Sequence, residues 1–225
     1  MGVIREEHSG AALGFTVKSG WASAVLISGS AAAPCLSDAQ RISLSDPGVP
    51  ESRQPYHAGS GTARESGAEL SQFVRAVERY GKQSVTRLIR RYQTQGYVLG
   101  GAGLVVGSLI EPERIANAHI RIHALEGKLF RDVIQTAAAQ AGLICSTWRE
   151  RDLYAFAAGF FTREEPQLRR IVAELGRSAE GPWRAEGKGA ALAAWLVLAG
   201  ARPLPAMEDP RSVNRTRSRR SPRGM

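Results

Sequence analysis

The sequence is poor in the residues that mark specialised protein classes. Only two cysteines, Cys35 and Cys145, occur among 225 residues, which excludes a fold held together by a disulfide framework. No apolar run reaches the roughly 18–20 residues that a membrane-spanning helix needs, and the longest runs, residues 98–110 and 189–200, are rich in glycine or alanine. With 43% hydrophobic and 23% charged residues, the chain has enough apolar side chains for a core, which excludes global disorder.

Acidic residues are missing from the last fifteen positions, which contain six arginines. Without those six charges the formal net charge of +9 drops to +3. Because the tail has almost no aliphatic side chains, we expect it to be disordered. Arginine-rich tails attract nucleic acid or other anionic surfaces. Arg217, Arg219 and Arg220 are therefore candidate phosphate contacts, and a merely solubilising terminus is the alternative.

The N-terminal region lacks the basic start of a secretory signal peptide. Glu6, Glu7 and His8 stand there, and the apolar block that follows, residues 21–29, is short. We therefore expect a cytoplasmic protein in which both cysteines stay reduced thiols.

The hydrophobic pattern predicts an α/β protein. Apolar and polar residues alternate in three short stretches separated by turn residues, which indicates an antiparallel meander over residues 13–18, 21–28 and 36–44. The elements expected after it are a helix over 63–95, a strand over 97–108, a helix over 112–141, a strand over 143–148, and helices over 151–161, 166–175 and 187–199.

Two residues in this pattern carry specific expectations. Gly81 is a point at which the first long helix can kink or split, because glycine lowers helix stability. Pro112 is expected near the first turn of the second long helix, where its missing N–H costs nothing.

We expect four regions along the chain: a flexible N-terminus (1–10), an α/β domain (11–160), a C-terminal helical extension (161–202) and a disordered basic tail (203–225). Three antiparallel strands followed by alternating helices and strands predict a mixed five-stranded sheet, in the order β-β-β-α-β-α-β-α, with helices on both faces.

This order of elements resembles the RNase H-like superfamily, which includes Holliday-junction resolvases, over residues 12–160. The resemblance implies nucleases that hold two divalent metals on carboxylates in the middle of the first strand, at the end of the fourth and on a later helix. Here the first strand offers Thr16 and Lys18, and the fourth ends at Ser108 with Glu111 three residues beyond. The sequence therefore predicts the fold without the family's two-metal chemistry.

Three of the four histidines form a second candidate site together with one carboxylate. His119, His123 and Glu126 share one stripe of the helix over 112–141, and His57 lies in the long loop before the first long helix. These residue types can act as general acids and bases near neutral pH or ligate a transition metal. The Glu that directly follows the first His in zinc proteases is missing, so a metal is not favoured. A solvated helix flank with ordinary histidines is the third interpretation.

Basic and aromatic residues elsewhere are candidates for phosphate binding. Lys18 ends the first strand, Arg53 and Tyr56 lie in the long loop, and Arg149 and Arg151 follow the fifth strand, where open α/β sheets place ligand contacts. The alternative for the loop residues is that they keep the loop soluble, and for the residues after the fifth strand that they form ion pairs with one another. The first long helix is also basic, through Arg75, Arg79, Lys82, Arg87, Arg90 and Arg91, and a solvated face is the alternative to a nucleic-acid contact.

Three functions remain open from the sequence. The leading hypothesis is an RNase H-like domain that lacks two-metal chemistry and binds nucleic acid or another phosphate-bearing partner. The alternative is a hydrolase or metal-dependent enzyme that uses His57, His119, His123 and Glu126 as its catalytic residues. The last is a non-catalytic scaffold.

Overall fold

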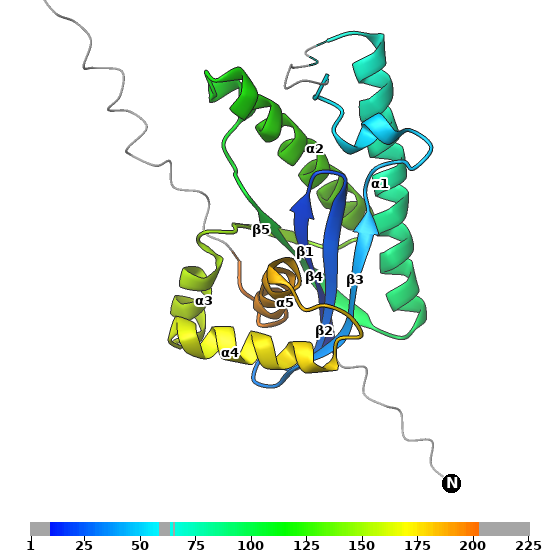
Figure 1. The fold of residues 1–225 in the computed structure, drawn as a ribbon. Coiled ribbons are helices and arrows are strands. Elements are labelled where there is room, and N and C mark those ends of the chain that lie inside the picture. The colour runs from blue at the N-terminus through cyan, green and yellow to red at the C-terminus, as the bar shows by residue number, and fades with distance from the viewer. Residues whose placement is uncertain (1–9, 59–63, 65, 203–225) are drawn as a thin grey trace, which may run out of the picture.

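The computed structural model describes residues 10–58, 64 and 66–202 (Figure 1). The sheet is built from β1 (Gly10–Lys18), β2 (Trp21–Gly29), β3 (Pro34–Ser43), β4 (Val98–Val106) and β5 (Cys145–Arg149). The helices are α1 (Ala68–Thr94), α2 (Ala118–Gln140), α3 (Leu153–Phe161), α4 (Glu165–Leu175) and α5 (Ala185–Leu198), with short 3-10 turns at Pro50–Arg53, Pro112–Arg114 and Gly176–Ser178.

The five strands form one mixed sheet in the order β3-β2-β1-β4-β5. β1 pairs antiparallel with β2, and β2 antiparallel with β3, whereas β4 pairs parallel with β1 and β5 parallel with β4. β1, β3, β4 and β5 therefore end at the same edge of the sheet, which we call the carboxyl edge. The expected α/β fold class, with a mixed five-stranded sheet, is confirmed.

Helices cover both faces of the sheet (Figure 1). α1 and α2 pack on one face, against alternate apolar side chains of β1 such as Leu13 and Phe15. α5 crosses the other face, and α3 and α4 pack beside it in a second core that contains Trp148 and Trp195. The helices of residues 161–202, expected as an extension, thus share a core with the sheet.

α5 can lie directly on β1 and β4 because glycine faces it from both strands. A Cβ on Gly14 would lie 1.8 Å from the carbonyl oxygen of Ala190, and one on Gly103 would lie 2.6 Å from that of Ala193. Such distances are possible only without a side chain on the strand. The alanine-rich sequence of α5 follows from the same constraint, since larger side chains would push the helix away from the sheet.

Two local expectations were wrong. α1 runs without interruption through Gly81, which is buried where a Cβ would lie 2.7 Å from Val133 Cγ1 and 3.1 Å from the Leu44 carbonyl oxygen. Here glycine allows close packing and does not break the helix. Pro112 begins a separate 3-10 turn, and α2 starts later, at Ala118, after the N-cap Asn117, whose side chain accepts a hydrogen bond from the Ile120 N–H at 3.0 Å.

Both cysteines are free thiols. Cys35 is exposed on β3, whereas burial raises the pKa of the Cys145 thiol to about 12. None of the described helices is long and apolar enough to cross a bilayer.

We expect Gly14→Ala to destabilise the protein by about 2 kcal/mol or more, because the new methyl group overlaps the α5 backbone. The matched control is Gly159→Ala in α3, where a Cβ meets nothing within 4 Å and helix propensity favours alanine by up to about 1 kcal/mol. Urea unfolding curves of the two variants measure the difference. Equal midpoints would show that α5 does not approach β1 closely.

Candidate functional site

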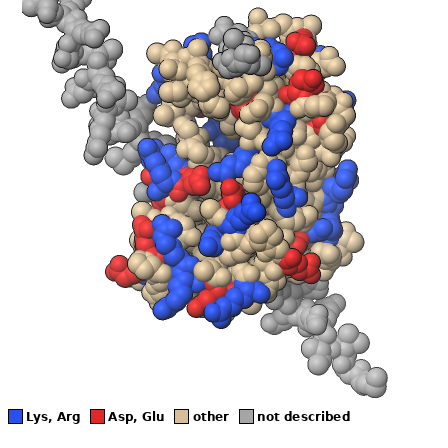
Figure 2. Space-filling view, in the orientation of Figure 1, with Lys and Arg blue, Asp and Glu red and all other residues tan. Residues whose placement is uncertain are grey.

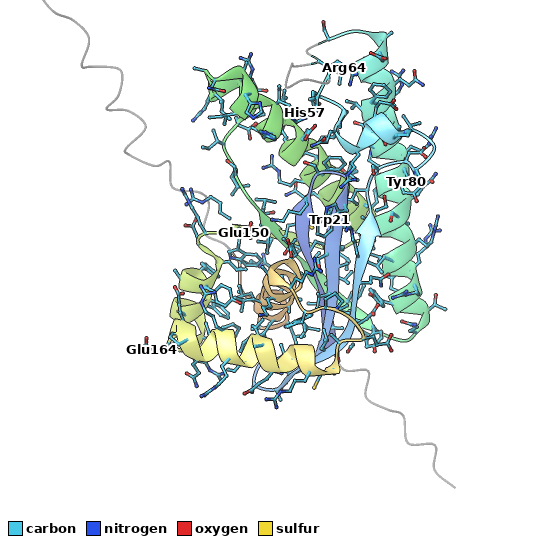
Figure 3. All side chains as sticks on the ribbon, viewed as in Figure 1. Trp21, His57, Arg64, Tyr80, Glu150 and Glu164 are labelled. Carbon is cyan, nitrogen blue, oxygen red and sulfur yellow. The ribbon has the colours of Figure 1, made fainter. Side chains whose placement is uncertain are left out.

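A polar cluster lies at the carboxyl edge of the sheet. Its residues come from three segments that meet there: the turn between β1 and β2, the loop between β3 and α1, and the first half of α2. Ligands of open α/β sheets bind outside the carboxyl ends of their strands. Figure 3 shows His57 between α2 and the segment that carries Arg64.

Glu126 is the buried centre of this cluster. The periodicity of α2 places it on the face that also buries Ile122, Phe130 and Val133, and none of its surface is exposed. Its Oε2 accepts a hydrogen bond from the Ser19 hydroxyl at 3.1 Å, and its Oε1 lies 2.8 Å from Nδ1 of His57. Burying a carboxylate is costly unless polar groups compensate it, and these two partners are such groups.

Three imidazole rings extend from Glu126 toward the surface. The His57 side chain is 18% exposed, and its ring centroid lies 5.1 Å from that of His123. His123 and His119 are exposed, and their Nε2 atoms lie 3.3 Å apart. The structure therefore brings together the four residues that the sequence singled out, and their role stays a prediction.

The cluster has two chemical uses. A buried carboxylate that holds Nδ1 of an imidazole orients the ring and leaves the other nitrogen available as an acid or base. Alternatively, one ligand atom each of His57, His123 and Glu126 lie within 4.8 Å of one another, which is close enough for a shared metal ion.

The loop that carries His57 is held by an arginine that the sequence analysis missed. Arg64 Nη1 donates hydrogen bonds to the carbonyl oxygens of Pro55 at 2.9 Å and His57 at 3.0 Å, and its guanidinium lies over the ring of Phe73. Its backbone N–H also donates to the Tyr56 carbonyl at 2.8 Å. Neither Arg64 nor Ser19 has a local sequence signal beyond its position near a glycine-containing turn.

Tyr56 is half-buried and packs against the core under α1 and α2. Desolvation raises the pKa of its hydroxyl, and the charge of Glu126 adds to the effect. The ring therefore anchors the loop to the core through apolar packing, and its hydroxyl stays protonated at neutral pH.

Three of the other residues expected to bind phosphate lie beside acids. Lys18 Nζ is 3.3 Å from Glu150 Oε2, Arg149 pairs with Asp152, and Arg151 Nε is 3.6 Å from the same Asp152. Figure 2 shows this mixing of cations and acids over the face on which α5 lies. Arg53 is exposed and packs its stem against Gly20. Arg217, Arg219 and Arg220 lie outside the described residues.

The face of β1 toward α5 is neutral where the resemblance implies metal-binding carboxylates. Gly14 and Thr16 face the helix from the middle and end of β1, and the Thr16 hydroxyl donates to the Glu186 carbonyl at 2.8 Å. A Cβ on Gly189 would lie 3.1 Å from the same hydroxyl. Backbone and small side chains thus fill this space, which we call the sheet floor. Within the described part of the chain, the one group of three candidate metal ligands is His57, His123 and Glu126, at the carboxyl edge.

Comparison of the sequence with models of protein families and with curated proteins finds no match. Among solved structures, the chain is similar to Thermus thermophilus RuvC, with 12% identity and a TM-score of 0.49 over 86% of this chain and 99% of that one. T. thermophilus RuvC in complex with a Holliday junction substrate gives 12% identity and a TM-score of 0.49, over 87% and 99% of the two chains. The yeast mitochondrial Holliday junction resolvase Ydc2 gives 10% and 0.41, over 85% and 81%.

These likenesses are of fold. The strand order and pairing of the chain itself establish its class, a mixed five-stranded sheet with helices on both faces, as expected from the order of elements.

Replacing Arg64 with alanine should loosen the loop that carries His57. The variant loses two charge-assisted hydrogen bonds to loop carbonyls, worth about 2 kcal/mol locally. Hydrogen–deuterium exchange over residues 50–57 should therefore become faster, while Arg170→Ala on the exposed side of α4 leaves it unchanged. Unaltered exchange in the Arg64 variant would mean that the loop is held by other contacts.

Proposed function

We propose that this chain is an RNase H-like domain that binds nucleic acid, or another phosphate-bearing partner, without the two-metal cleavage chemistry implied by the resemblance. The observation that carries the proposal is a basic groove between the C-terminal halves of α1 and α2, with a volume of about 470 Å³. It is lined by Lys82, Gln83, Thr86, Arg87, Arg90 and Gln140.

The groove differs in charge from the carboxyl edge. Its lining contains three cations and no acid, and Lys82, Arg87 and Arg90 have no acidic partner in the described part of the chain. On the same helix, Arg79 and Arg91 are paired with Asp46 and Asp38. Cations without a partner are free to neutralise phosphates and release the counterions condensed on them.

The spacing of the groove residues suits a polymeric anion. Lys82, Thr86 and Arg90 are four residues apart, so they form one stripe with a repeat of about 6 Å along the helix axis. Between the cations, the hydroxyl of Thr86 and the amide of Gln83 offer the neutral donors that proteins use on phosphate oxygens. The groove can therefore follow a short stretch of nucleic-acid backbone.

The neutral sheet floor supports the second half of the proposal. Two-metal cleavage requires carboxylates that hold both ions beside the scissile phosphate. On the sheet floor, the Thr16 hydroxyl already donates its hydrogen bond to the Glu186 carbonyl. The glycines there allow the backbone of α5 to pack directly against the strands. Among the described residues, no group of three carboxylates lies at the sheet floor.

Changing Lys82, Arg87 and Arg90 together to glutamine should weaken binding to nucleic acid and lower the slope of log affinity against log salt by up to about 3. The matched control replaces Arg169, Arg170 and Arg177, on and after α4, with glutamine, which removes the same charge elsewhere. Fluorescence anisotropy with labelled single-stranded and duplex DNA between about 50 and 200 mM salt measures both slopes.

Two kinds of result, one on binding and one on cleavage, would contradict the proposal. The first is a groove variant that binds as tightly as the control variant, or a wild-type chain that binds no DNA at about 50 mM salt. The second is cleavage of branched or linear DNA by the wild-type chain that depends on Mg²⁺ or Mn²⁺ and is lost on replacing Glu150, the ion-pair partner of Lys18, or Glu186, whose backbone carbonyl accepts from Thr16.

A further inference from the structure

The cluster at the carboxyl edge goes beyond the proposed function, because nucleic-acid binding in the α1–α2 groove does not use it. We propose that His57, His123 and Glu126 bind one divalent transition-metal ion of the zinc class. The site would be distinct from the sheet floor, where the resemblance implies metals bound by carboxylates alone.

The donor set selects the class of ion. Two imidazole nitrogens and one carboxylate oxygen suit Zn²⁺, Co²⁺ or Ni²⁺, whereas Mg²⁺ takes oxygen ligands almost exclusively. Two histidines and one glutamate also leave the fourth position of a tetrahedral ion open for water or a substrate oxygen.

The distances are short enough for a shared ion. One ligand atom from each of the three residues lie within 4.8 Å of one another. A tetrahedral zinc with bonds of about 2.0–2.1 Å separates its ligand atoms by about 3.3 Å. His123 is exposed at the surface of α2, so its side chain has room to turn toward the other two ligands.

The charge of the cluster also favours a cation. Glu126 is fully buried, and its described hydrogen-bond partners are one hydroxyl and one imidazole. The rings of His57, His123 and His119 follow one another at centroid distances of 5.1 Å and 4.7 Å. A divalent ion coordinated by the nitrogen lone pairs of these rings would compensate the buried carboxylate.

The surrounding contacts hold two of the ligands in place before any ion binds. Ser19 fixes Oε2 of Glu126, which leaves Oε1 facing His57. Arg64 fixes the carbonyl of His57 and that of Pro55, two residues before it. Outer contacts of this kind typically contribute tenfold to a hundredfold in metal affinity.

The test uses the untagged full-length chain, because a histidine tag would bind the same ions. After dialysis against a chelator, Co²⁺ is titrated and its visible absorption recorded, and Zn²⁺ is then added as a competitor. We expect one Co²⁺ per chain, a spectrum of four- or five-coordinate nitrogen and oxygen ligation, and displacement by one equivalent of Zn²⁺.

Substitutions then assign the ligands. His123→Ala and Glu126→Gln should each weaken Co²⁺ binding by at least tenfold, and Ser19→Ala by about tenfold. Glu174→Gln, the same change on the exposed side of α4, should leave affinity unaltered. Because His123 is exposed, its variant keeps the fold, which circular dichroism checks.

The proposal is overturned if the wild-type chain binds no stoichiometric Co²⁺ or Zn²⁺, or if folded His123→Ala and Glu126→Gln variants bind as tightly as wild type. Either failure leaves the groove proposal standing, since Lys82, Arg87 and Arg90 are not part of this cluster.

Discussion

The close approach of α5 to β1 and β4 is the constraint on which the rest of the structure depends. Gly14 and Gly103 allow the carbonyls of Ala190 and Ala193 to lie against the strands. The Thr16 hydroxyl donates a hydrogen bond to the Glu186 carbonyl and so holds the start of α5. The same contact that builds the second core also fills the sheet floor. A large or charged side chain there would have to displace a helix, so packing and metal binding compete for one space.

With the floor closed, the polar chemistry of the sheet lies at its carboxyl edge. Glu126 is buried by α2, yet it faces the turn after β1 and the loop after β3, so three segments distant in sequence share one carboxylate. Ion pairs such as Lys18 with Glu150 neutralise the neighbouring surface. The α1–α2 groove is lined by Lys82, Arg87 and Arg90, which have no acidic partner within the described part of the chain, so the proposed nucleic-acid surface is separate from the histidine cluster.

Much of the fold could be predicted from the sequence because it depends on local periodicity. Alternating residues mark β1 to β3, and the 3.6-residue repeat marks α1 and α2, so the strand order follows from known rules of connection. The role of Gly81 could not be predicted, because Val133 and Leu44, which lie far away in sequence, decide whether glycine breaks a helix or admits a neighbour. Asn117, a good N-cap, could have predicted the start of α2, but Pro112 is the stronger local signal for a helix start and pointed to an earlier residue.

The candidate site was predictable only as a set of residue types. The spacing of His119, His123 and Glu126 places them on one helical stripe, but the burial of Glu126 depends on Ser19 and His57, 107 and 69 positions away. Arg64 has no local pattern that connects it to the carbonyls it holds. The paired state of Lys18 and Arg149 likewise depends on which acids the fold brings beside them.

Anomalous diffraction from crystals grown with Zn²⁺ and Mn²⁺ tests the central claim most directly. The account predicts one zinc peak between His57, His123 and Glu126, and no manganese beside Thr16 and Gly189. A pair of manganese peaks between β1 and α5 would contradict it, because that space would then hold metal ions in place of packed backbone.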